Sequence, residues 1–155
     1  MTTPPKPNVR RARQQDLDQL LALELLSFSG DRLSRERFRH WLKADNGLLL
    51  VAQSPSDGSI AGYALAFTRR DSTMARLYSI AVSPQHKGHG IGRLLLARAE
   101  QEARQMGCRG LRLEVAQNNM PAIGLYESMG YQRFATLPGY YEDGQTAVRM
   151  QKRFE

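Results

Sequence analysis

The chain has 155 residues, of which 41% are hydrophobic and 24% are charged, and its net charge is +7. The chain has one cysteine, which excludes a disulfide scaffold, and it lacks the Cys and His spacing of a zinc domain. No apolar run approaches the ~20 residues that a membrane helix requires. The positive charge indicates an anionic partner, but the basic residues are scattered, which does not favour specific binding of nucleic acid. We expect a cytoplasmic protein without metal or membrane contacts, with a flexible tail over residues 1–8 and a single domain over residues 9–155.

Hydrophobic periodicity and turn residues divide the chain into strand and helix candidates. Asp16, Ser34 and Asn119 (or Asn118) are expected to cap helices, because each carries a short polar side chain just before a helical pattern. The predicted strands span residues 9–13, 48–53, 60–68, 76–82, 111–115, 131–137 and 146–154. The predicted helices span residues 16–28, 34–43, 92–106 and 119–130, and Gly30 and Asp31 are expected to stop the first. The order β-αα-βββ-α-β-α-ββ indicates a mixed α/β domain.

A glycine-rich turn joins the third long strand candidate to the helix that follows it. Gly88, Gly90 and Gly92 alternate there with other residues. Glycine has no Cβ atom, so backbone N–H groups can approach an anion closely, and the start of a helix adds unpaired N–H groups and a positive dipole end. This combination predicts a cradle for a phosphate or pyrophosphate, with Lys87 and Arg93 as additional cationic contacts.

Three other interpretations of this turn compete with the phosphate cradle. A Walker A loop requires Gly-Lys-Ser/Thr, whereas Gly92 is followed by Arg93 and Leu94, so that loop is excluded. A dinucleotide fingerprint requires a different glycine spacing near the start of a doubly wound sheet, and three strand candidates precede this turn. A turn that only lets a strand and a helix pack together remains the structural alternative.

These residues resemble motif A of the GNAT superfamily of N-acetyltransferases, which reads Arg/Gln-x-x-Gly-x-Gly/Ala at a strand-to-helix turn. The best register is Lys87-x-x-Gly90-x-Gly92, in which lysine departs from the usual Arg or Gln. Gln85-x-x-Gly88-x-Gly90 also matches the pattern but lies two residues earlier. The stretch from Leu113-Glu114-Val115 through Asn119 and residues 122–131 resembles motif B. The tail around Tyr140 and Tyr141 is similar to the RimI-like branch, whose members acetylate the N-terminal amine of a ribosomal protein.

The resemblance covers nearly the whole chain and implies a fold, a co-substrate and a set of binding residues. The implied fold is a mixed, mostly antiparallel twisted sheet of about six or seven strands flanked by about four helices. The implied co-substrate is acetyl-CoA, with no metal. The residues that it assigns to binding acetyl-CoA are Ile80, Ala81, Val82, Lys87, Gly88, His89, Gly90, Ile91, Gly92, Arg93, Asn119 and Tyr126.

The resemblance also implies two catalytic residues, for which the residues alone allow another interpretation. Glu114 is implied as the general base, directly or through a water, although a carboxylate in mid-strand can equally be solvated or paired with an arginine. Tyr126 is implied as the acid that protonates the CoA sulfur, although a tyrosine at helical spacing is commonly a core residue. Asn119 is implied to contact the pantetheine arm, and an ordinary N-cap is the alternative.

The acceptor site is less well defined by the sequence. Tyr140 and Tyr141 are candidates for lining a peptide channel or for packing as aromatics, and Glu24 is a candidate for meeting an amine or for joining a buried network. We expect an enzyme, an N-acetyltransferase that acts on a protein or peptide N-terminal amine. Acetylation of a small-molecule amine, a non-catalytic acyl-CoA-binding module and a nucleic-acid binder are the alternatives, the last without a cluster of cations to support it.

Overall fold

The computed structural model describes residues 6–28 and 32–155. Its strands are β1 (Asn8–Arg11), β2 (Gly47–Gln53), β3 (Ile60–Phe67), β4 (Met74–Val82), β5 (Gly110–Ala116), β6 (Gln132–Leu137) and β7 (Ala147–Arg153). Its helices are α1 (Leu17–Ser27), α2 (Arg35–Lys43), α3 (Ile91–Gln105) and α4 (Met120–Ser128), with 3-10 turns at Gln14–Asp16 and Pro84–His86. The predicted order is confirmed. The predicted stop at Gly30 and Asp31 lies outside the described residues.

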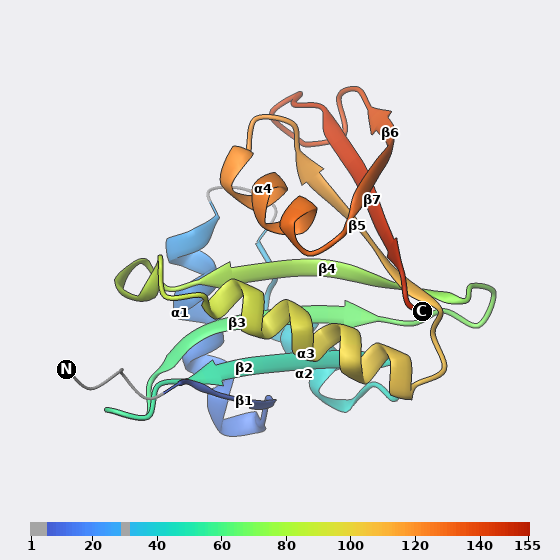
Figure 1. Cartoon of the computed structure of the whole chain (residues 1–155). Coiled ribbons are helices and arrows are strands. Elements are labelled where there is room, and N and C mark those ends of the chain that lie inside the picture. Colours follow the sequence, from blue (N-terminus) through green and yellow to red (C-terminus); the bar gives the residue numbers. More distant parts are fainter. Residues whose placement is uncertain (1–5, 29–31) are drawn as a thin grey trace.

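The strands form one seven-stranded sheet in the order β1-β2-β3-β4-β5-β7-β6. All neighbouring pairs are antiparallel except β4 and β5, which run parallel. The expected mixed, mostly antiparallel sheet is therefore confirmed. Figure 1 shows α3 and α4 on one face of the sheet and α1 and α2 on the other. No helix among the described residues is long and apolar enough to cross a membrane.

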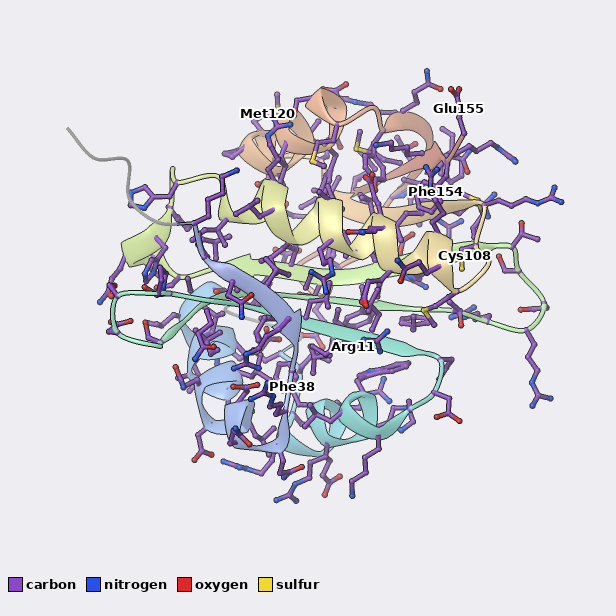
Figure 2. All side chains as sticks on the ribbon, turned by 60° about the horizontal axis from the view of Figure 1, so that its bottom comes forward. Arg11, Phe38, Cys108, Met120, Phe154 and Glu155 are labelled. Atoms are coloured by element: carbon purple, nitrogen blue, oxygen red, sulfur yellow. The ribbon has the colours of Figure 1, made fainter. Side chains whose placement is uncertain are left out.

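Each face of the sheet carries its own hydrophobic core. Leu48, Leu50 and Ala52 belong to the cluster beneath α3 and α4, whereas Leu49 and Val51 belong to the cluster beneath α1 and α2. Side chains alternate across a strand, so β2 needs apolar residues at successive positions to fill both cores. In Figure 2, Phe38 of α2 lies on one side of the sheet, whereas Cys108 and Phe154 lie near the end of α3 on the other.

Asp16 occupies the N-cap position of α1, as predicted, but its side chain makes no capping hydrogen bond there. The carboxylate is 3% exposed, accepts two hydrogen bonds from the Arg10 guanidinium at 2.8 and 3.0 Å, and accepts a third from the Arg13 N–H at 2.7 Å. Burial opposes ionisation, but the contacts with Arg10 and Arg13 outweigh it and lower the pKa of Asp16. Asp16 therefore joins β1 to the start of α1.

Replacing Asp16 with alanine is expected to lower the free energy of unfolding by about 2–3 kcal/mol, because the mostly buried Arg10 loses its charged partner and keeps only neutral acceptors, Gln53 Oε1 and the Arg11 carbonyl. Urea denaturation at pH 7 measures this loss. Asp18→Ala is the matched control, since the Asp18–Arg35 pair at 3.0 Å is exposed and contributes at most about 1 kcal/mol. Because folding lowers the pKa of Asp16, its contribution is present above pH ~4 and is lost as the pH falls further. Equal losses in the two variants would contradict this assignment.

Candidate functional site

The sheet splits at its centre, between the two parallel strands. β4 and β5 are paired from Met74 opposite Gly110 to Leu77 opposite Leu113, and no pair between these strands follows in the described residues. Beyond that point β4 continues to Val82 alongside β3, and β5 continues alongside β7. Figure 1 shows the two strands diverging. Each therefore presents an unpaired backbone edge, with which an extended ligand rich in amides can pair as an added strand.

A β-bulge lies in β4 at the start of this split. The β3–β4 register passes from Leu65 opposite Ser79 to Ala66 opposite Leu77, so Tyr78 has no partner on β3. A bulge of this kind leaves the extra residue out of the hydrogen-bonded ladder and re-aims the side chains beyond it. The sequence carried no visible signal for the bulge, because it depends on how β4 registers against β3. The predicted residues Ile80, Ala81 and Val82 follow it along the edge of the split.

The loop after β4 has the open backbone predicted for a phosphate cradle. Gly88 and Gly90 have φ angles of 84° and 77°, in the left-handed region, and a Cβ atom at either position would meet no atom of the described residues within 4 Å. α3 begins one residue earlier than predicted, at Ile91, with no side-chain cap. The bond from the Leu94 N–H to the Gly90 carbonyl, 3.1 Å, is the first of the helix, so the preceding N–H groups remain available to an anion.

Two of the residues predicted to bind acetyl-CoA, Gly92 and Arg93, contribute to the packing of α3 against α4. A Cβ atom at Gly92 would lie 3.3 Å from Leu125 Cδ2, so this glycine permits close approach of the two helices. Arg93 donates a hydrogen bond to Ser128 Oγ of α4 at 2.7 Å. Lys87 and His89 are exposed on the loop itself. Phosphate contacts of these residues stay predictions.

α4 carries two of the predicted residues. Asn119 caps this helix, because its Oδ1 accepts a hydrogen bond from the Ala122 N–H at 3.3 Å. Tyr126 is 5% exposed and packs edge-on against Tyr131 with ring centroids 5.8 Å apart. Burial, and then the proximity of Tyr141, raise the pKa of Tyr126 above the ordinary tyrosine value. Its hydroxyl therefore stays protonated at neutral pH and is able to act as a donor.

Glu114 is the first residue of β5 beyond the split. Its neighbours Leu113 and Val115 point into the core beneath α3 and α4, so the Glu114 side chain lies on the opposite face, where it is 8% exposed. Arg76 Nη2 donates a hydrogen bond to Glu114 Oε1, and Arg149 Nε donates one to Oε2 at 3.4 Å. The arginine-paired carboxylate that the sequence left as an alternative is thus present. Arg76 and Arg149 were not among the predicted site residues.

The two predicted tyrosines of the β6–β7 connection reach the same place. Tyr140 OH accepts a hydrogen bond from Arg76 Nη2 at 2.9 Å and donates one to Glu114 Oε1 at 3.4 Å. Tyr141 packs edge-on against Tyr140 with ring centroids 5.0 Å apart. Burial, and then the proximity of Tyr140 and Glu114, raise the pKa of Tyr141 to about 12. The fold thus brings Glu114, Arg76 and both loop tyrosines together, and Tyr141 is near enough to Tyr126 to contribute to its raised pKa.

Glu24 lies in a buried network, which is one of the two alternatives left open by the sequence. It is 2% exposed; its Oε2 accepts a hydrogen bond from the Leu33 N–H at 2.7 Å and its Oε1 accepts one from Tyr63 OH. The Tyr63 hydroxyl is also 2.9 Å from Ser79 Oγ, next to the bulge. Both carboxylate oxygens are therefore occupied, and a contact with an acceptor amine stays a prediction. Tyr63 and Ser79 lie within apolar strands, where the sequence offers no signal for a polar network.

Comparisons with known proteins agree with this geometry. Residues 15–131 match the family described as "Acetyltransferase (GNAT) family". A Bacillus subtilis (strain 168) protein, provisionally named as an alanine N-acetyltransferase of ribosomal protein bS18, is 31% identical over 146 residues, which cover 94% of this chain and 94% of that protein.

Solved structures give the same result at the level of the fold. The crystal structure of the ribosomal-protein-S18-alanine N-acetyltransferase from Escherichia coli is similar with a TM-score of 0.83 and 27% identity, over 94% of this chain and 92% of that one. The crystal structure of nourseothricin acetyltransferase is similar with a TM-score of 0.79 and 25% identity, over 96% of this chain and 99% of that one. The predicted resemblance is confirmed for the family and for the fold.

Proposed function

Because the chain belongs to the acetyltransferase (GNAT) family of acyltransferases, we propose that it transfers the acetyl group of acetyl-CoA to the N-terminal amine of a protein or peptide. The main support for this proposal is that β4 and β5 are no longer paired after Leu77 and Leu113, and that Glu114 is the first β5 residue beyond this point. The names of the Bacillus subtilis and Escherichia coli relatives, both acting on an alanine of a ribosomal protein, support the choice of acceptor.

The backbone around the split supports acetyl-CoA as the donor. The uncapped N-terminus of α3 and the open backbone at Gly88 and Gly90 fit a pyrophosphate, because both present N–H groups that no Cβ atom shields. Lys87 is exposed on the same loop and adds a positive charge. The free edge of β4 at Ile80, Ala81 and Val82 fits the amide-rich pantetheine arm, with Asn119 as the proposed contact from α4.

The reaction needs a proton acceptor, an oxyanion site and a proton donor. An α-amino group has an ordinary pKa of about 8, so much of the acceptor is protonated at neutral pH and must lose a proton before it attacks. Glu114 is the proposed base, directly or through a water. As the nitrogen–carbon bond forms, an N–H group released by the bulge at Tyr78 is the proposed donor to the oxyanion. As the carbon–sulfur bond breaks, the Tyr126 hydroxyl is the proposed donor to the departing sulfur, and the second proton that the acceptor nitrogen loses restores this hydroxyl.

The two arginines that donate hydrogen bonds to Glu114 limit how this carboxylate can act as a base. A carboxylate oxygen accepts the amine proton only through a lone pair that Arg76 and Arg149 leave free. Tyr140 is also in contact with this carboxylate, so an acceptor that displaces the Tyr140 hydroxyl would obtain direct access. Otherwise the proton passes through a water held between the acceptor and Glu114.

Replacing Gly90 with alanine is expected to weaken acetyl-CoA binding by about tenfold. An L side chain disfavours the positive φ of Gly90 by roughly 1–2 kcal/mol, and relief of that strain moves the N–H groups at the start of α3. Isothermal titration calorimetry measures the dissociation constant. Gly107→Ala is the matched control, because Gly107 has a φ of 89° and an equally open Cβ position beyond the other end of α3. A tenfold loss in both variants would show that strain, and not the cradle, causes the effect.

The proposed function is tested by calorimetric titration with acetyl-CoA, followed by measurement of thiol release with a panel of amines. The panel contains peptides with free N-termini, the same peptides with blocked N-termini and an internal lysine, and small amines. Thiol release that requires a free peptide N-terminus is the expected result. Binding without release from any amine would support a non-catalytic acyl-CoA-binding module, and absence of binding would refute the proposal.

Acetylation of a small-molecule amine is the second candidate, and the similarity to nourseothricin acetyltransferase over 96% of the chain favours it. The same panel separates the two candidates. Thiol release with small amines but with no peptide would support acetyl-CoA as the donor and the proposed chemistry. It would identify a small-molecule amine, and not a peptide, as the acceptor.

A further inference from the structure

A pocket lined by three arginines adjoins the proposed reacting centre. It has a volume of about 340 Å³ and lies between α2, the end of β3 and the first half of β4. Arg37 comes from α2, Arg69 from the turn after β3, and Arg76 from β4. Among the residues that the structure describes, no carboxylate lines this pocket.

The other wall of the pocket is aromatic and held in place by stacking. Trp41 stacks on Phe67 with ring centroids 4.9 Å apart and an interplanar angle of 14°. The Arg69 guanidinium carbon lies 5.6 Å from the centroid of the Phe67 ring, and Tyr78 lies 6.3 Å from the same ring, centroid to centroid. An apolar surface edged by guanidinium groups suits a side chain with methylene groups and a terminal carboxylate.

The charges of this pocket are unbalanced. Among the described residues neither Arg37 nor Arg69 forms an ion pair, and both are exposed. Of the three pocket arginines, Arg76 is paired with Glu114, which it shares with Arg149. Two uncompensated positive charges at the rim attract an anionic group and repel a cationic one.

Two residues connect the pocket to the reacting centre. Arg76 lines the pocket and donates its hydrogen bond to Glu114, and Tyr78, which is 45% exposed, is the residue of the bulge. One arginine side chain thus separates the pocket from the proposed base. A peptide whose N-terminus lies beside Glu114 can therefore reach the pocket with one of its first residues, since each extended residue spans at most ~3.3–3.6 Å.

We propose that this pocket, lined by Arg37, Arg69 and Arg76, selects acceptor peptides that carry Asp or Glu at the second or third position. This inference rests on the proposed function, because it assumes that a peptide N-terminus lies beside Glu114. The pocket has room for one or two side chains, which fits a short peptide segment. The carboxylate of the acceptor residue takes the place of the solvent that now surrounds Arg37 and Arg69.

The first experiment compares acceptor peptides that differ only at the second and third positions. One peptide carries Ala-Glu-Glu, one Ala-Gln-Gln and one Ala-Lys-Lys, each followed by the same uncharged residues. We expect kcat/KM, measured by thiol release, to be about tenfold higher for the Glu peptide than for the Gln peptide, and lowest for the Lys peptide. The advantage of the Glu peptide is expected to shrink as the salt concentration rises.

The second experiment uses variants of the two arginines that do not touch Glu114. Arg37→Gln and Arg69→Gln are each expected to lower kcat/KM for the Glu peptide roughly fivefold and to leave the Gln peptide unchanged. Arg69→Glu is expected to shift the preference toward the Lys peptide. Arg70→Gln is the matched control, because Arg70 neighbours Arg69 in sequence, is exposed and does not line the pocket.

The outcomes separate this inference from the proposed function. Thiol release with the Gln peptide equal to that with the Glu peptide would overturn the inference and leave the proposed function intact. Free glutamate is measured as an acceptor beside the three peptides, and a preference for it over every peptide would show that the carboxylate recognised belongs to a small amino acid and would overturn the choice of a peptide. Absence of release with all peptides would refute the proposed function itself.

Discussion

Replacing Tyr126 with phenylalanine is expected to lower kcat by about 100-fold and to change the affinity for acetyl-CoA by less than about twofold. The ring of Tyr126 is held in the core beneath α4 by Tyr131 and its other neighbours, and phenylalanine preserves that packing. Only the hydroxyl is lost, so the variant removes the proposed proton donor without removing the fold. Single-turnover thiol release measures the rate of the chemical step.

The control for this variant is Tyr131→Phe in the same aromatic pair. The Tyr131 hydroxyl donates a hydrogen bond to Glu100 Oε2 at 2.7 Å, away from the residues gathered around Glu114. This variant is expected to lose stability but to keep its kcat. An equal fall of kcat in both variants would show that the aromatic pair serves packing and would contradict the role of Tyr126 as a donor.

The pH dependence gives an independent check on Tyr126. Burial raises its pKa above the ordinary value of ~10, so the hydroxyl remains protonated in the folded protein at a pH where a free tyrosine has ionised. The wild-type kcat should therefore not fall through ionisation of this group as the pH rises to 10. A decline of kcat centred between pH 8 and 9 would assign the donor to another group.

Replacing Glu114 with glutamine is expected to lower kcat/KM by about 100-fold at pH 7 and by about tenfold at pH 9. The difference arises because an α-amino group with a pKa of about 8 is about tenfold more deprotonated at pH 9 than at pH 7, and so needs the base for one proton fewer. Steady-state thiol release with one peptide across this pH range measures the recovery. Recovery at high pH distinguishes a base from a residue that only holds Arg76 and Arg149 in place.

Glu100→Gln is the matched control for the Glu114 variant. Glu100 is also a mostly buried glutamate with two partners, since it accepts hydrogen bonds from Tyr131 and from Lys152 at 2.7 and 2.8 Å. Its replacement is expected to affect stability without a pH-dependent recovery of activity. An equal loss of kcat/KM at pH 7 and pH 9 in the Glu114 variant would contradict its role as a base. The carboxylate would then only position Arg76 and Arg149, and the amine proton would pass to water.

Local chemistry explains why much of the fold was predictable. Ser34 caps α2 by accepting a hydrogen bond from the Arg37 N–H at 3.2 Å, and Asn119 caps α4 in the same way, both within three residues of the capping side chain. The positive φ angles at Gly88 and Gly90 are likewise a local requirement that only glycine meets easily. Signals of this kind need no knowledge of distant residues.

By itself, the sequence determined the order of the elements, the family and the glycine turn, because periodicity, caps and turn residues act over a few neighbouring positions. Only the tertiary structure decided where β4 and β5 part, that Tyr78 is bulged, and that Arg76 pairs with Glu114 across 38 positions of the chain. It also decided between the alternatives for Glu24, which ends in a network with Tyr63, 39 positions away. These features depend on strand register and on side chains that meet only after folding, and no local pattern encodes them.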